Sequence, residues 1–319
     1  MTQIPVQSSS LEALVKRLPI ELARSSFSAS ARLYDLLIRP VLPRIAQGDQ
    51  VVFVPDGVLH AVPFAALLDL STRRHLFQHY VVAVAPSATF YVEALARDCA
   101  LQSDQTPTVL AVGNPAFNPK FAPTLLSLPD SEVEAAQLAN LFPGSETLTG
   151  SRATLEAFLS AASRHEIVHF GGHALVNWDF PLLSHLLLAP EDQDDSGLLY
   201  AHELYKTRLG NVRLAVLAAC RTASGPIQGE GVQSLARAFL AAGVPGGVAS
   251  LWDVEDAVSS NFFQEFYQHL RQGDSAPAAL RQAQLTLLRD ADPSASSPVD
   301  WAAFEFVGAS CALTHTRKE

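Results

Sequence analysis

Two residues that could act as a nucleophile and its base follow two apolar runs of the sequence. Cys220 ends the run Leu214-Ala-Val-Leu-Ala-Ala-Cys220, and His173 ends the run Ile167-Val-His-Phe-Gly-Gly-His173. Each run predicts a buried strand, and ligands bind where the carboxyl ends of such strands meet. A thiol attacks as its thiolate, and an imidazole can take the thiol proton and return it to a leaving amine. The pattern therefore predicts a cysteine–histidine dyad.

Structural and metal-binding alternatives exist for these residues. A free cysteine is among the most buried residue types, and a histidine at a strand end often only makes a hydrogen bond. His169 and His173 are four residues apart, a spacing that suits a metal only on a helix. The acidic run 191–195 lacks the spacing of an EF-hand loop. We therefore predict no metal and no other cofactor.

The composition restricts the class of protein. The chain has 319 residues, is 48% hydrophobic and carries a net charge of −10, with no basic block to neutralise phosphates. We therefore expect neither nucleic acid nor a membrane as a direct partner. Three widely spaced cysteines, Cys99, Cys220 and Cys311, predict reduced thiols rather than a disulfide framework. The absence of a long apolar run or a secretory signal completes the prediction of a cytoplasmic protein.

Strands and helices are expected to alternate, which predicts a mostly parallel sheet with helices on both faces. The expected strands cover residues 51–55, 80–85, 108–112, 166–170, 213–219, 246–252 and 301–307. The expected helices cover residues 31–37, 132–141, 232–242, 257–270 and 277–289, with one more after an N-cap at Thr154. Residues 1–30 are expected to form a linker or partly ordered arm, weakly helical at 11–17.

Further blocks of sequence carry a family resemblance. They include Val54-Pro-Asp-Gly-Val-Leu-His-Ala-Val-Pro-Phe64, the run that begins Gly229-Glu-Gly-Val-Gln-Ser-Leu235, Gly247-Val-Ala-Ser-Leu-Trp-Asp253 and Trp301-Ala-Ala-Phe304. Over residues 30–308 these blocks resemble the CHAT domain family, caspase-like peptidases that are often fused to tetratricopeptide repeats. The sequence around Cys220 also resembles the caspase signature, in which the histidine lies about 50 residues upstream.

The resemblance implies a caspase-like α/β fold with its catalytic pair at His173 and Cys220. It implies an arm (1–30), an N-terminal caspase-like half without the dyad (31–150) and a catalytic half (151–319). The glycines before His173 are expected to allow a tight turn and close approach of a substrate. Backbone N–H groups near Gly172, Ala174 and Cys220 are expected to face the developing oxyanion.

Substrate preference is expected to depend on charged side chains near the thiol. Glu230, Asp253 or Asp256 in the pocket would favour a basic substrate residue, whereas Arg221 would favour an acidic one. Arg221 stands where the family commonly has Glu, and its cation beside Cys220 would help to form the thiolate. Asp256 has an alternative role as the N-cap of the helix 257–270.

The predicted function is a cysteine endopeptidase. The resemblance implies that it cleaves selected proteins, such as a gasdermin-type pore former, in bacterial defence or regulated cell death under a separate sensor or regulator. The first alternative is a catalytically silent caspase-like interaction module or sensor-regulated scaffold. The second is an acyltransferase or thioesterase that uses the same pair.

Overall fold

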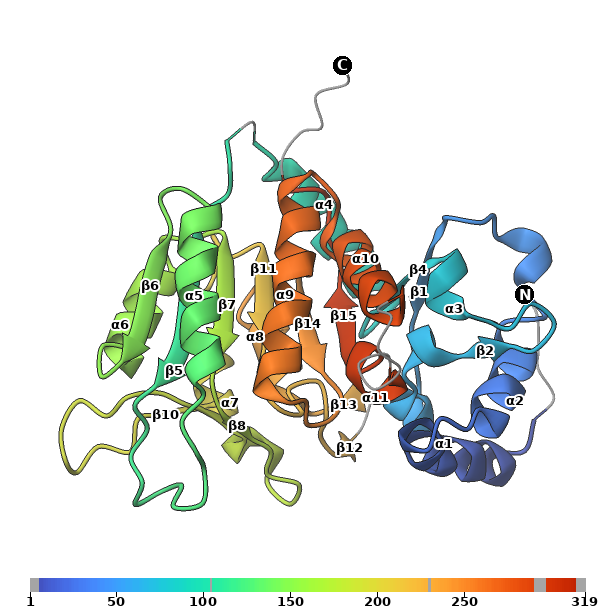
Figure 1. The fold of residues 1–319 in the computed structure, drawn as a ribbon, viewed down its shortest axis with the longest axis horizontal. Coiled ribbons are helices and arrows are strands. Elements are labelled where there is room, and N and C mark those ends of the chain that lie inside the picture. The colour runs from blue at the N-terminus through green and yellow to red at the C-terminus, as the bar shows by residue number, and fades with distance from the viewer. Residues whose placement is uncertain (1–5, 104, 229–230, 290–296, 314–319) are drawn as a thin grey trace.

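A central sheet of eight strands organises the molecule (Figure 1). The structure is a computed structural model that describes residues 6–103, 105–228, 231–289 and 297–313. The sheet has the order β1-β4-β15-β14-β11-β7-β5-β6. These strands are β1 (Gln50–Phe53), β4 (Val81–Val84), β5 (Val109–Pro115), β6 (Glu146–Gly150), β7 (Ile167–Gly171), β11 (Leu214–Leu217), β14 (Gly246–Ser250) and β15 (Phe304–Gly308).

Neighbouring strands are parallel except at one place, where β15 runs antiparallel to β14. Three short sheets lie outside the central one. They contain β2 (Leu68–Asp69) with β3 (Arg74–His75), β8 (Ala174–Leu175) with β9 (His185–Leu187) and β10 (Leu198–Tyr200), and β12 (Ile227–Gln228) with β13 (Gly231–Val232). The predicted mostly parallel α/β architecture is confirmed.

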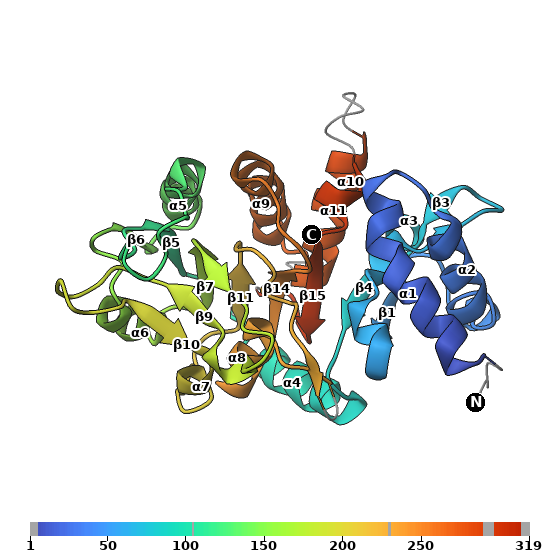
Figure 2. The ribbon, with the colours of Figure 1, turned by 90° about the horizontal axis from the view of Figure 1, so that it is seen from below.

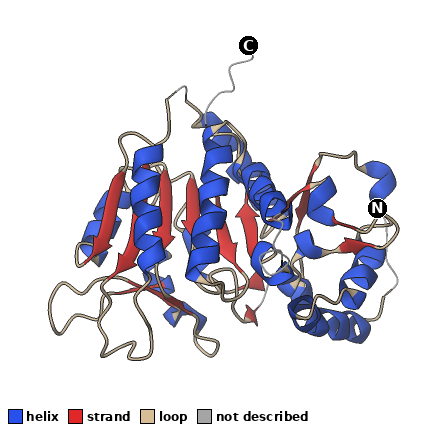
Figure 3. Ribbon diagram, in the orientation of Figure 1, coloured by secondary structure: helices blue, strands red, loops and turns tan. Residues whose placement is uncertain are grey.

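Helices cover both faces of the sheet, as Figures 2 and 3 show, with α5, α9 and α10 on one face and α4, α6, α7 and α8 on the other. The described helices are α1 (Ser8–Ala23), α2 (Ser28–Leu37), α3 (Leu76–His79), α4 (Ala88–Ala100), α5 (Pro129–Leu141), α6 (Leu155–Ala162), α7 (Ala201–Leu204), α8 (Leu235–Ala241), α9 (Asp256–Arg271), α10 (Ala276–Arg289) and α11 (Pro298–Trp301). Phe158, Phe239 and Phe266 are among the fully buried side chains that these helices pack against the sheet.

Helix starts follow local capping chemistry. Thr154 caps α6 as predicted, because its Oγ1 accepts a hydrogen bond from the N–H of Ala157 at 3.3 Å. The helix expected from residue 232 instead begins at Leu235. Ser234 caps it by accepting from the N–H of Arg237 at 3.2 Å.

The N-terminal segment differs from the arm expected for residues 1–30. Helix α1 covers Ser8–Ala23 and buries Val15, Leu18 and Leu22 against the core that also holds Tyr34 of α2. The helix extends beyond the weakly helical stretch expected at residues 11–17 and contains Pro19. Burial of the apolar face outweighs the hydrogen bond that Pro19 removes.

The strands do not separate at residue 150. β1 and β4 lie at one end of the sheet, whereas β5 and β6, from the same predicted half, lie at the other end beyond β7. The five strands from β14 to β6 share one direction, so their carboxyl ends form one continuous edge. The division into domains stays a prediction.

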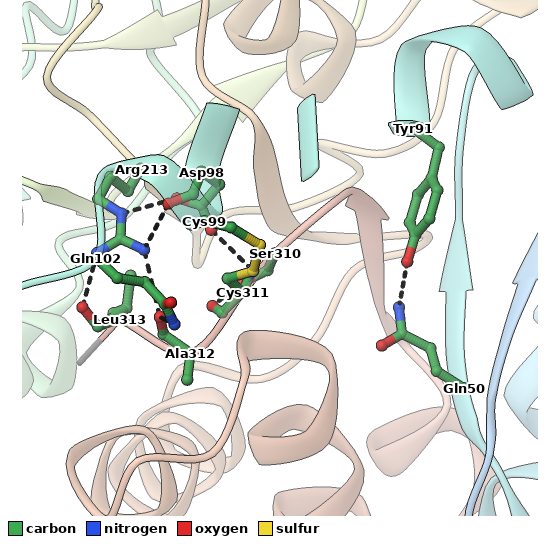
Figure 4. The surroundings of a disulfide bond; sticks show 10 residues. All are labelled: Gln50, Tyr91, Asp98, Cys99, Gln102, Arg213, Ser310, Cys311, Ala312 and Leu313. Carbon is green, nitrogen blue, oxygen red and sulfur yellow. Dashed lines mark hydrogen bonds and ion pairs between the residues drawn. A yellow bond between two sulfur atoms is a disulfide. The ribbon is translucent and has the colours of Figure 1, made fainter. Parts of the chain in front are cut away.

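A disulfide bond corrects the expectation of three reduced cysteines. Cys99, in α4, is bonded to Cys311, which follows β15, and their Cα atoms are 5.2 Å apart. Figure 4 shows the bond beside a buried ion pair in which Arg213 Nε lies 2.7 Å from Asp98 Oδ1. Cys220 is the free cysteine. Among the described residues no helix is long and apolar enough to cross a membrane.

Candidate active site

The register of two central strands brings Cys220 and His173 together. Leu214 of β11 pairs with Ile167 of β7, and Leu217 pairs with Phe170, so paired residues differ by 47 positions (217 − 170 = 47). Cys220 and His173 differ by the same number (220 − 173 = 47). Each therefore lies three residues past a paired position, on strands that are about 4.8 Å apart. The spacing of about 50 residues between histidine and cysteine in the caspase signature thus corresponds here to the register of β7 and β11.

Both side chains line one small cleft at the carboxyl edge of the sheet. The cleft has a volume of about 60 Å³, and its walls also include Gly172, Ala218, Val254 and Asp256. Cys220 and His173 are both half-buried. A thiol and an imidazole thus share one partly desolvated space, and their catalytic roles stay a prediction.

A backbone carbonyl orients His173. Its Nε2 lies 2.7 Å from the carbonyl oxygen of Leu126. A carbonyl oxygen only accepts hydrogen bonds, so Nε2 carries the proton and Nδ1 of the neutral ring is the basic nitrogen. Phe117 packs edge-on against the ring, with centroids 5.3 Å apart. The sequence did not predict this contact of the Leu126 carbonyl, because any residue type can supply a backbone acceptor.

Asn114 holds the loop that delivers this carbonyl. Its Oδ1 accepts from the hydroxyl of Ser127 at 3.0 Å and from the N–H of Leu128 at 2.9 Å. Asn114 has φ +48°, a left-handed conformation in which Asn is enriched. The sequence predicted a turn at Asn114, but not its connection to Leu126. Leu126 lies fourteen residues after residue 112, where we expected the strand to end.

A hydrogen-bond network fixes the loop that carries Cys220. The N–H of Ser250, at the end of β14, donates to Thr222 Oγ1 at 3.0 Å. The Ser250 hydroxyl donates to the Ala219 carbonyl at 2.5 Å. Arg221 lies between these anchors with φ +58°, which turns the chain sharply just after the nucleophile. Ser250, at the end of β14, therefore fixes the loop after β11, and this loop carries the Cys220 thiol.

Arg221 is paired rather than free, although its charge acts on the thiol in the predicted direction. Its Nε and Nη2 donate to the two carboxylate oxygens of Asp253, both at 2.9 Å. Burial, and then the Asp253 charge, raise the pKa of the Cys220 thiol, although Arg221 and a hydrogen bond from Val254 oppose them. The resting residue is therefore a protonated thiol that needs a base.

Asp256 lines the cleft at Cys220, which is one of the two positions expected for it, but it is not the N-cap of its own helix. It is the first residue of α9, but its Oδ2 accepts from the N–H of Asp130 at 3.1 Å, at the start of α5. It therefore caps a neighbouring helix rather than its own. Burial raises the pKa of this carboxyl, while the nearby His173 lowers it. Asp256 links the starts of α5 and α9 at the wall of the cleft.

The other predicted residues divide among three outcomes. Gly172 lines the cleft, but its missing Cβ makes room for the Phe170 ring, which a Cβ would approach to 2.8 Å, rather than for a substrate. Ala174 begins β8, pairs with Leu186 and is not part of the cleft wall. Its role as an oxyanion donor stays a prediction. Glu230 lies outside the described residues.

The sequence profile of the CHAT domain matches residues 28–309. The chain belongs to the CHAT domain family. The recognition made from the sequence blocks is therefore confirmed, and the strands that carry His173 and Cys220 both fall inside this CHAT domain.

Two curated proteins are similar to this CHAT domain along most of its length. Tetratricopeptide repeat protein 28 of Mus musculus is 30% identical over 332 residues, and that of Homo sapiens is 29% identical over 328 residues. Each match covers 88% of this chain but only 13% of the relative. The chain thus spans a small part of the relatives that it matches.

Solved structures share the architecture of the CHAT domain. Gingipain R, described as an Arg-specific cysteine proteinase, matches with a TM-score of 0.57 and 11% identity over 98% of this chain and 69% of its own. The separase of the Saccharomyces cerevisiae separase–securin complex matches with a TM-score of 0.55 and 15% identity over 82% of this chain and 15% of its own. The predicted caspase-like fold is confirmed.

Proposed function

We propose that this CHAT domain is a cysteine endopeptidase whose nucleophile is Cys220 and whose base is His173. The observation that supports the proposal is the shared cleft, which both side chains line, each three residues past a paired position of two neighbouring strands. The likeness in fold to an Arg-specific cysteine proteinase supports it at the level of architecture.

The proposed reaction begins with proton transfer from the Cys220 thiol to His173 Nδ1. The sulfur attacks the peptide carbonyl carbon, and a C–S bond forms as negative charge develops on the oxygen. The C–N bond then breaks, and His173 returns the proton to the leaving amine. Water hydrolyses the thioester to a carboxylic acid and restores the thiol. The Leu126 carbonyl holds the proton on Nε2, which leaves Nδ1 to accept the thiol proton, and it stabilises the protonated ring.

The family resemblance predicts that the substrate is an effector protein. Cleavage of a complex peptide mixture tests the proposal without knowledge of that substrate. The purified chain is incubated with peptides from a digested proteome, and new termini are identified by mass spectrometry. We expect new termini with the wild-type chain and none with Cys220→Ala. Equal termini from both proteins, or none from the wild type, would refute the endopeptidase.

A further inference from the structure

A larger apolar cavity lies on the other side of the segment that follows β14. It has a volume of about 320 Å³ and is lined by Pro19 of α1, His60, Trp178, Ala223, Leu251 and Trp252, among others. Its volume is in the range of ligand pockets. It is much larger than the cleft at Cys220, and its wall includes neither Arg221 nor Asp253.

The cavity is physically connected to the nucleophile. Ala223 lies three residues after Cys220, and its N–H donates to the Ser250 carbonyl at 2.8 Å. Ser250 and Val254 line the thiol cleft, whereas Leu251 and Trp252, between them, line the cavity. A peptide lying over residues 250–254 with its carbonyl at Cys220 would direct the adjoining side chain into the cavity.

The walls of the cavity select against charge. Arg221 and Asp253 neutralise each other through their paired hydrogen bonds. Burial and the nearby Arg237 charge lower the pKa of His60, so its imidazole is neutral at pH 7. Trp252 Nε1 donates to the Val299 carbonyl at 2.7 Å, which satisfies its polar atom away from the cavity. A charged guest would lose its water, and the described residues that line the cavity include no Asp, Glu, Lys or Arg to replace it, because Arg237 lies outside this lining.

His60 adds no polar atom that a guest could reach. Its Nε2 is buried from solvent, and within the described part of the chain it has no hydrogen-bond partner. The other lining residues are mainly apolar, with Ala223, Leu251 and Trp252 among them. The cavity therefore suits an uncharged side chain that is mainly apolar.

We propose that this cavity is the specificity pocket of the peptidase and holds a large, uncharged apolar or aromatic side chain on the residue whose carbonyl Cys220 attacks. The proposal rests on the proposed endopeptidase function. It replaces the charge-based preference expected from Arg221, Asp253 and Asp256, because the first two pair with each other and Asp256 caps a helix. Burying such a side chain favours binding by roughly 10- to 100-fold over leaving it exposed.

Peptide acyloxymethyl ketones that differ only at the residue next to the reactive group provide the first test. The rate of Cys220 labelling is measured by intact mass for probes with Leu, Phe, Lys or Asp at that residue. We expect the Leu and Phe probes to react at least tenfold faster than the Lys and Asp probes. Trp178→Ala should reduce that preference about fivefold, because Trp178 forms an exposed wall. Phe180→Ala, another exposed aromatic of the same loop, is the matched control and should retain it.

Binding to the Cys220→Ala variant separates the pocket from the chemistry. N-acetyl-leucine amide and N-acetyl-lysine amide are titrated while tryptophan fluorescence is recorded, and we expect at least tenfold tighter binding of the leucine amide. Preferential binding without probe labelling would overturn the peptidase and keep the pocket. Labelling with a preference for Lys or Asp, or equal binding of the two amides, would overturn the pocket.

Discussion

At the scale of single residues, the nucleophile is restrained by its own surroundings. Asp253 is held by Arg221 at 2.9 Å, and its carboxylate lies close enough to raise the pKa of the Cys220 thiol. Burial acts in the same direction, so the free chain keeps the thiol protonated. A substrate that displaces or covers this ion pair would change the charge around the sulfur just before the attack.

Asp253→Asn is expected to lower the pKa of Cys220 and to free Arg221 to stabilise the thiolate. At pH 7 alkylation of Cys220 by iodoacetamide should become about three- to tenfold faster, since one pKa unit is a tenfold change in the ionised fraction. The midpoint of the pH–rate curve should move down. Glu255→Gln removes an exposed carboxylate two residues away and serves as the control. An unchanged midpoint in Asp253→Asn would show that this charge does not act on the thiol.

The residues that could be predicted from the sequence are those with reactive side chains. Cys220 and His173 were predicted because each ends an apolar run, and both line one cleft, while their catalytic roles stay a prediction. Leu126 acts through a carbonyl and Asn114 through a loop that returns to it, so neither has a local signature. The partners of Arg221 and Asp256 were not predicted, because hydrogen bonds across 32 or 126 positions are not visible in one sequence.

At the scale of elements, a buried polar cluster joins the strand before His173 to two helices. His169 Nε2 of β7 lies 3.2 Å from Glu134 Oε1 of α5, and its Nδ1 lies 3.2 Å from the hydroxyl of Tyr267 in α9. Burial raises the pKa of Glu134 well above its usual value and lowers that of His169 to about 3. The Glu134 carboxyl is therefore protonated and the His169 ring is neutral, so the pair carries no net charge.

The free energy of unfolding of the wild type is expected to fall at alkaline pH, and Glu134→Gln is expected to abolish this fall. Above about pH 6.5 the folded wild type retains a proton on Glu134 that the unfolded chain has released, so its free energy of unfolding should fall by about 1.4 kcal/mol per pH unit until the raised pKa is passed. Below about pH 4.5 the unfolded chain protonates both groups, so stability falls as the pH falls towards 3.

Urea unfolding at a series of pH values measures this effect. In Glu134→Gln the alkaline slope should be flatter than in the wild type, whereas the partly exposed Glu265→Gln in α9 should leave it unchanged. Identical slopes in Glu134→Gln and the wild type would mean that Glu134 is ionised in the folded protein.

At the scale of the whole molecule, the segment after β15 closes the fold. Cys311 is bonded to Cys99, and the buried Arg213 donates to the carbonyl of Leu313 at 2.7 Å and to Asp98. Arg213 directly precedes β11, whose far end delivers Cys220. The mostly parallel sheet and the helices on both faces could be predicted from alternating patterns, but not the strand order or the disulfide, whose cysteines are 212 residues apart.

Removal of the disulfide is expected to destabilise the chain by about 2–5 kcal/mol, because the bond closes a long loop of the unfolded chain. Urea unfolding with and without dithiothreitol measures the loss, and Cys311→Ser should behave as the reduced protein does in either condition. Alkylation of the unreduced, denatured wild type should modify Cys220 alone. Three alkylated cysteines with no effect of dithiothreitol would contradict the pairing of Cys99 with Cys311.

Joint action of sulfur and imidazole is measured most directly by comparing two reagents on two proteins. A leucine acyloxymethyl ketone peptide should label Cys220 of the wild type, and His173→Gln should slow this reaction by about 100-fold or more. Alkylation by iodoacetamide at pH 10, where the thiol ionises without help, should differ little between the two proteins. If the peptide reagent labels wild type and His173→Gln at equal rates, His173 does not serve Cys220, and the account of this site is wrong.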